Sequence, residues 1–128
     1  MYLIEIKLAR IMIADDSELV RSTLKDMLEL GKHQVISEAV DGVDTLEKFN
    51  STKPDVLLLD IAMPKKDGVE TLIQIMKSNP DAKVIMITAH HDMELIENCI
   101  EIGALAYISK PFNTDDILHS ISYAFEEN

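Results

Sequence analysis

Residues 57–68 read LLLDIAMPKKDG: three leucines lead into Asp60, and Pro64 follows four positions later. A short, uniformly apolar run is typical of a strand that is buried on both faces of a sheet. Proline lacks the backbone N–H that a sheet needs, so the strand has to end before Pro64. The stretch therefore predicts a central strand that presents a carboxylate at its end.

The rest of the chain alternates runs of this kind with longer stretches of helical periodicity. Strands are predicted at Arg10–Ala14, Gln34–Ala39, Val56–Leu59, Lys83–Ile87 and Ala106–Ser109. Helices are predicted at 17–30 with Ser17 as N-cap, 42–50, 67–78, 93–102 before Gly103, and 114–125 with Thr114 as N-cap. Strict alternation favours an α/β fold: a five-stranded parallel sheet with helices on both faces, joined by right-handed crossovers.

Length and composition limit the function classes. The 128 residues fit one domain, 1–128, with a core of about 9–126. Acidic residues outnumber Lys and Arg by 23 to 12, which argues against direct nucleic-acid binding because phosphate contacts need clustered cations. The single cysteine, Cys99, cannot form an intramolecular disulfide. No apolar run approaches the roughly 20 residues of a membrane span, so we expect no membrane insertion and a cytoplasmic location.

Polar side chains stand where four of the predicted strands end, whereas the second strand ends at Ala39. In a parallel sheet these ends share one edge. If the first and third strands are neighbours, about 4.8 Å apart, three carboxylates crowd together and need protons or a cation to relieve their repulsion. Hard oxygen ligands of this kind suit Mg²⁺. The polar residues at the strand ends are Asp15, Asp16, Asp60, Thr88 and Lys110.

This set predicts a phosphoryl site. Asp60 would be the nucleophile, and Lys110, about 10 Å away along the sheet, carries a long side chain whose point charge suits a phosphate oxygen. The hydroxyl of Thr88 can donate a hydrogen bond to another such oxygen. An aspartate at a strand end is usually a turn or helix cap, so the prediction depends on four segments ending in suitable groups together.

Four stretches carry a resemblance to a known family. They are IMIADDS at 11–17, PDVLLLDIAMPKKDG at 54–68, VIMITA at 84–89 and GALAYISKPF at 103–112. Together they resemble the receiver domain of two-component response regulators, of the stand-alone, chemotaxis (CheY-like) type. The resemblance implies a flavodoxin-like (βα)5 three-layer sandwich with strand order 2-1-3-4-5.

The resemblance also implies roles for the residues at the strand ends. Asp60 would accept a phosphoryl group from a sensor histidine kinase. Asp16 and Asp60 would bind Mg²⁺ directly, Asp15 mostly through a bound water, and Ala62 through its backbone carbonyl.

The remaining implied roles concern contacts to the phosphoryl group and the transmission of the signal. Lys110 and Thr88 would contact the phosphoryl oxygens, the bond between Lys110 and Pro111 is commonly cis in the family, and Tyr107 matches the switch aromatic. Phosphorylation adds about −1.5 to −2 charges, so Thr88 gains a phosphoryl partner in one conformation that it lacks in the other. We expect the new contact of Thr88 to change the conformation of the face formed by residues 93–125, so that this face binds an output partner.

Several alternatives stay open at this point. A chain that ends soon after helix 114–125 favours a stand-alone regulator in chemotaxis, with a phosphorelay intermediate or the receiver of a transcriptional regulator as alternatives. A haloacid dehalogenase-type phosphatase would need a second acid where Ala62 stands. A flavin-binding module would need a phosphate loop where Asp15 and Asp16 stand.

Two segments resist assignment. His90, His91 and Asp92 could suggest a metal site, although a solvated loop is the better interpretation. The alternating Ile4, Ile6 and Leu8 could lengthen the first strand or cover a neighbouring element.

Overall fold

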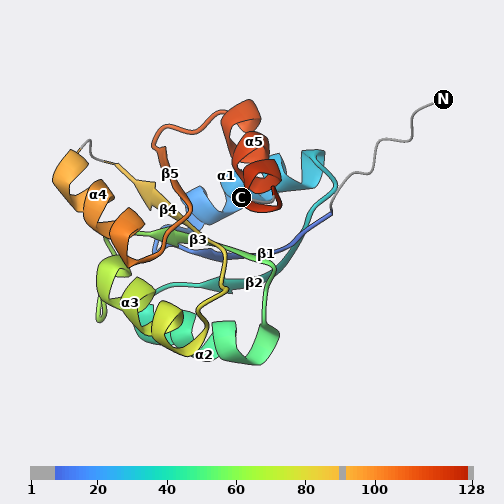
Figure 1. The fold of residues 1–128 in the computed structure, drawn as a ribbon. Coiled ribbons are helices and arrows are strands. Elements are labelled where there is room, and N and C mark those ends of the chain that lie inside the picture. Colours follow the sequence, from blue (N-terminus) through green and yellow to red (C-terminus); the bar gives the residue numbers. More distant parts are fainter. Residues whose placement is uncertain (1–7, 90–91, 127–128) are drawn as a thin grey trace.

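A five-stranded parallel sheet runs through the middle of the molecule (Figure 1). The computed structural model describes residues 8–89 and 92–126, so Ile4, Ile6, His90 and His91 lie outside the described residues. The order β2-β1-β3-β4-β5 confirms the predicted topology, and each neighbouring pair is parallel. The strands are β1 (Arg10–Ala14), β2 (Gln34–Ala39), β3 (Val56–Asp60), β4 (Val84–Thr88) and β5 (Ala106–Ser109).

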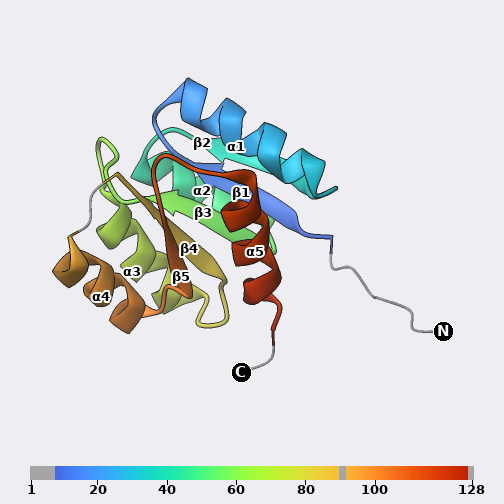
Figure 2. The same ribbon diagram turned by 90° about the horizontal axis from the view of Figure 1, so that it is seen from above.

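Five helices cover the two faces of this sheet. Figures 1 and 2 show α1 and α5 on one face, and α2, α3 and α4 on the other. This is the three-layer arrangement that the sequence predicts, because each strand-to-strand crossover contains one helix. The helices are α1 (Glu18–Leu30), α2 (Gly42–Thr52), α3 (Gly68–Ser78), α4 (Met93–Ile102) and α5 (Thr114–Ala124).

The core consists of two apolar clusters separated by the sheet. Side chains alternate across β3: Leu57 and Leu59 join the cluster under α2, α3 and α4, whereas Leu58 joins the cluster under α1 and α5. All five residues of β3 are buried. The apolar run that precedes Asp60 is therefore explained by helices on both sides of a central strand.

The helix starts follow the predicted capping chemistry, with one correction. Ser17 caps α1, and its hydroxyl accepts a hydrogen bond from the Val20 amide at 3.2 Å. The prediction of Thr114 as the N-cap of α5 is wrong. The cap is Asn113, which has an extended backbone and whose Oδ1 accepts a hydrogen bond from the Asp116 amide at 2.8 Å. Thr114 is instead the first residue of the helix.

Small differences remain at the element ends. β4 begins and ends one residue later than predicted, so that Thr88 is its last residue, and α2 extends to Thr52. The peptide bond between Lys110 and Pro111 is cis, as the resemblance implied. Within the described part of the chain, none of the helices is long and apolar enough to cross a membrane.

Candidate functional site

Asp60 is the last residue of β3 and lies at the carboxyl edge of the sheet. It is 4% exposed, and its partner in the ladder with β4 is Ile87. Its Oδ1 accepts a hydrogen bond from the Ala62 amide at 3.3 Å. This contact within the turn leaves Oδ2 to face the other groups of the site.

The two aspartates after β1 differ in burial. Asp15 is fully buried, and its amide continues the ladder by donating to the Ala39 carbonyl at 3.0 Å. Its Oδ1 accepts from the Ser17 amide at 2.9 Å, whereas its Oδ2 accepts no hydrogen bond within the described part of the chain. Asp16 is exposed at the rim.

Carboxylate oxygens of Asp15, Asp16 and Asp60 lie within 4.8 Å of one another. We call these three residues the aspartate cluster. Neighbouring strands β1 and β3 bring them together, as the sequence predicted from the shared edge of a parallel sheet.

Lys110 is the cation of the site. It follows β5, its amide donates to the Thr88 carbonyl at 2.8 Å, and its side chain is 25% exposed. Its Nζ lies 3.1 Å from Asp15 Oδ2 and 3.7 Å from Asp60 Oδ2. The first distance is that of an ion pair, although its geometry is not that of a hydrogen bond. The side chain thus reaches across β4 to the cluster, as its length allowed.

The electrostatic environment alters the acidity of Asp60. Burial, followed by the negative charge of Asp15, raises its pKa from 3.8 to about 6, while Lys110 and the Ala62 amide oppose the rise. One ammonium group faces three carboxylates here, so the charge of the cluster is only partly offset.

These features fit Mg²⁺. The cluster offers hard carboxylate oxygens, the ligand type that Mg²⁺ prefers, and one of them, Asp15 Oδ2, is buried without a hydrogen bond. No described His or Cys is part of the cluster, so its chemistry does not match a zinc site.

A tight turn closes the site below Asp60. The amide of Gly68 donates to the Ile61 carbonyl at 2.8 Å, and a Cβ atom on Gly68 would lie 2.2 Å from the Asp60 carbonyl oxygen. Only glycine permits α3 to begin this close to the end of β3. The helix is capped next to it by Asp67, whose side chain accepts from the Glu70 amide.

The other predicted site residues are placed as follows. Thr88 is 4% exposed at the end of β4, where its ladder partner is Ser109. Ala62 is exposed in the turn after β3. Tyr107 is 40% exposed on β5 and lines an outer groove rather than the aspartate cluster.

Sequence reasoning missed the residues that hold this rim together. Arg21 of α1 donates to the Asp15 carbonyl at 2.8 Å and forms an ion pair with Glu38 of β2. Asp41, which is buried, caps α2 and lies 3.3 Å from Lys65 in the turn after β3. Nothing in the sequence pattern marks these pairs, because their members lie far apart along the chain.

Comparison with known proteins identifies relatives over most of the chain. Residues 11–122 match the family model described as response regulator receiver domain. The chain is 36% identical over 115 residues to chemotaxis protein CheY of Listeria monocytogenes, covering 90% of this chain and 97% of that protein. It is 34% identical to transcriptional regulatory protein PdtaR of Mycobacterium tuberculosis, covering 90% of this chain and 56% of that protein.

Solved structures agree with the sequence comparison. A chain of the CheX–CheY–BeF3–Mg²⁺ complex from Borrelia burgdorferi superposes with a TM-score of 0.90 at 31% identity, covering 92% of this chain and 90% of that one. The arrangement of strands and helices is thus shared with proteins of the family that the sequence model identifies.

Proposed function

Because the chain belongs to the response regulator receiver domain family, we propose that it is a phosphorylation-controlled switch in which Asp60 is the phospho-acceptor. The family is a signalling family rather than one of classical enzymes. The observation that carries the proposal is the position of Asp60, buried at the end of the central strand beside Asp15 and Lys110. We further propose that residues 1–128 form a single receiver domain.

The proposed reaction is phosphoryl transfer from a phosphohistidine of a sensor kinase. An Asp60 carboxylate oxygen forms the new P–O bond as the P–N bond of the phosphohistidine breaks. The electron pair of the P–N bond stays on the imidazole nitrogen, and the imidazole takes up a proton. Lys110 offsets charge on the phosphoryl oxygens, and the Thr88 hydroxyl donates to one of them. In this sense the domain promotes only its own phosphorylation and dephosphorylation.

Asp15, Asp16 and Asp60, with the Ala62 carbonyl, would hold the Mg²⁺. The bound ion supplies charge neutralisation at the phosphoryl oxygens. The buried Oδ2 of Asp15 supports this assignment. It accepts no hydrogen bond and has Lys110 Nζ as an ion-pair partner at 3.1 Å, so a metal ion would relieve the remaining cost of its burial.

The proposed output lies on the face of residues 93–125. Phosphorylation gives Thr88 a new acceptor, and a change at the end of β4 reaches Tyr107 because Met86 and Tyr107 are ladder partners in β4 and β5. Tyr107 would then change its position in the outer groove and alter the affinity for a partner protein.

We propose chemotaxis signalling in the cytoplasm as the pathway, since the Listeria relative is a chemotaxis protein of nearly the same length as the matched region. A role in transcriptional regulation is the second candidate, because PdtaR matches over 56% of its length. The aspartate cluster and the family membership favour both over a phosphatase or a flavin-binding module.

A mass measurement tests the proposed acceptor. The protein is incubated with acetyl phosphate and Mg²⁺, and intact mass is recorded against time. We expect the mass of one phosphoryl group per chain, lost in Asp60→Asn and in EDTA but kept in Asp81→Asn, which changes an exposed loop residue. Phosphorylation of Asp60→Asn at the wild-type level, or steady multiple turnover of phosphate esters, would refute the proposal.

A further inference from the structure

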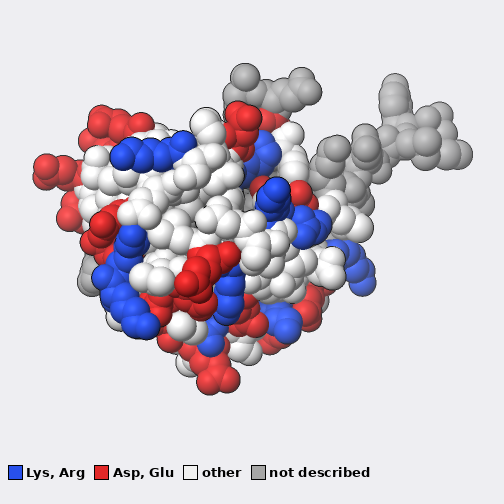
Figure 3. Space-filling model, turned by 90° about the horizontal axis from the view of Figure 1, so that it is seen from below, with Lys and Arg blue, Asp and Glu red and all other residues white. Residues whose placement is uncertain are grey.

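Acidic residues are concentrated at the end of the chain that carries the proposed output face. From residue 84 to residue 128 the sequence has eight Asp and Glu and one basic residue, Lys110, hence a formal charge of −7 out of the total of −11. Residues 43–83 by contrast have seven acidic residues and six lysines. Figure 3 shows such a mixed surface, with Lys and Arg interspersed among Asp and Glu on the lower side of the molecule.

The single cation of this region does not offset the surface charge. Lys110 Nζ points to Asp15 and Asp60 at the aspartate cluster and is three-quarters buried. The acids, in contrast, are exposed on α4 and α5, the helices that flank edge strand β5. Among the described residues from 92 to 126, the exposed acids on these two helices or directly beside them are Asp92, Glu94, Glu97, Glu101, Asp115, Asp116 and Glu126.

Apolar side chains are exposed among these acids. Leu95 and Ile102 of α4 pack on the core cluster that includes residues of α3, so that flank of the helix is occupied. Met93 and Ile100 lie on a different flank, because 100° per residue separates them from that side, and they are 51% and 43% exposed. Stable burial of such residues requires a partner.

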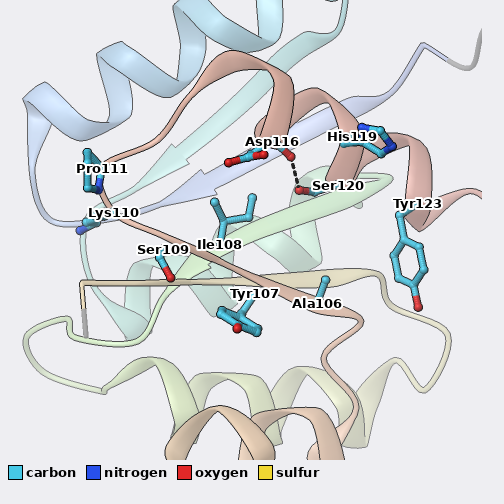
Figure 4. A pocket seen from close by; sticks show the side chains of 10 residues that line it. All are labelled: Ala106, Tyr107, Ile108, Ser109, Lys110, Pro111, Asp116, His119, Ser120 and Tyr123. Atoms are coloured by element: carbon cyan, nitrogen blue, oxygen red, sulfur yellow. Dashed lines mark hydrogen bonds between the residues drawn. The ribbon is translucent and has the colours of Figure 1, made fainter. Parts of the chain in front are cut away.

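A groove lies between β5 and α5 and is lined by residues of those two elements and of the loop that joins them. It has a volume of about 720 Å³, and Figure 4 shows Tyr107 of β5 and Tyr123 of α5 among its lining residues. Both tyrosines are 40% exposed. Their rings can bury apolar area while their hydroxyls stay at the polar rim, the property that enriches tyrosine at interfaces. We call the exposed residues of α4, β5 and α5 the acidic docking surface.

We propose that the acidic docking surface binds a cationic amphipathic segment of a partner protein, with apolar side chains in the groove and Lys or Arg paired with the acids of α4 and α5. This inference rests on the proposed function for its coupling to phosphorylation, and it specifies the chemistry of the partner.

Charge argues against a second copy of this chain as the occupant. A symmetric dimer through this surface would bring two regions of formal charge −7 together, and like charges in apposition cost affinity. A cationic segment instead gains electrostatic attraction and faster association, both weakened by salt.

Two synthetic helical peptides test the proposal. They share the same leucine and phenylalanine positions, but one carries lysines and the other glutamates on its polar face. The full chain, labelled with ¹⁵N, is titrated with each peptide with and without BeF3⁻ and Mg²⁺. We expect the lysine peptide to shift amide signals of residues 93–123, with a Kd that rises about tenfold between roughly 50 and 500 mM NaCl.

Two double variants locate the binding charge. Glu97→Lys/Glu101→Lys should weaken binding of the lysine peptide about tenfold, whereas Glu47→Lys/Asp81→Lys, with the same net charge but on α2 and the α3–β4 loop, should change it less than twofold. Equal binding of the glutamate peptide, equal effects of both double variants, or BeF3⁻-dependent dimerisation at low salt would overturn the proposal. Lysine-peptide binding that ignores BeF3⁻ would sustain the docking chemistry and contradict the proposed switch.

Discussion

Replacing Asp60 by Asn should stabilise the metal-free protein at neutral pH. The pKa of Asp60 is raised from 3.8 to about 6 in the fold, chiefly by burial. An acid with a raised pKa binds its proton more tightly in the folded state, so its ionisation penalises folding. This penalty appears as pH rises above 3.8 and is complete above about 6. Asparagine has the same shape and never carries the charge.

The two pKa values determine the size of the effect. A difference of about 2 pKa units corresponds to about 3 kcal/mol. Relaxation at the edge of the sheet and partial screening reduce this value, so we expect Asp60→Asn to gain roughly 1–2 kcal/mol at pH 7.5. At pH 5 about half of the penalty is already present, because the unfolded aspartate is ionised there, so the gain should shrink to roughly 0.5–1 kcal/mol.

Urea denaturation in EDTA at pH 5 and pH 7.5 measures both values. Asp81→Asn, which removes an exposed charge from a loop, is the matched control and should change little at either pH. Adding Mg²⁺ should stabilise the wild type and have less effect on Asp60→Asn. A variant no more stable than the wild type at pH 7.5, or a gain independent of pH, would refute this account of the aspartate cluster.

Three further substitutions test other parts of the structure by urea denaturation. Gly68→Ala should cost about 2–3 kcal/mol, because the added Cβ would meet the backbone of β3. Gly31→Ala should cost less than about 1 kcal/mol, because its Cβ would meet only the ends of side chains, which can move. Equal costs would contradict the close approach of α3 to the end of β3. His33 accepts a hydrogen bond from a backbone amide through Nδ1, and burial lowers its pKa, so the neutral ring stabilises the fold. His33→Gln should therefore cost about 1–2 kcal/mol at pH 7.5 and less as pH falls below 6.5, where protonation removes the stabilisation from the wild type. A cost that does not change with pH would exclude a neutral histidine. Asn113→Ala should cost about 1 kcal/mol and Thr114→Ala less than half of that, and the reverse order would restore Thr114 as the cap of α5.

The sequence predicts the strands well where a short run of residues is uniformly apolar. The Leu57–Leu59 run, ended by Pro64, is typical of a strand covered on both faces, and this places Asp60 at the sheet edge. Alternation of strands and helices predicts a parallel sheet with one shared edge, and the strand order implied by the resemblance makes the first and third strands neighbours. The aspartate cluster follows from these two predictions together. The fold and the meeting of carboxylates were predictable for this reason.

The sequence could not predict differences between neighbouring residues, because these depend on the direction in which each side chain points. Asp15 and Asp16 are adjacent and chemically identical, yet one is buried and the other exposed. The Asp15 amide still continues the ladder beyond Ala14, the last residue of β1, and the chain bends at Asp16. Asn113 and Thr114 are both good capping residues, and the exact start of α5 decides between them. The contact of Lys110 with Asp15 depends on three-dimensional geometry that periodicity does not describe.

The burial of every residue in β3 has a mechanical consequence for signalling. A carboxylate at the end of a strand that is packed between two helical layers cannot move far toward an incoming donor. Any charge added to Asp60 therefore appears at a fixed reference point in the molecule. Movement must then occur in less enclosed elements such as β5, where only Ile108 is buried. In the proposed switch, charge added at the enclosed end of β3 would therefore lead to displacement at the less buried edge strand β5.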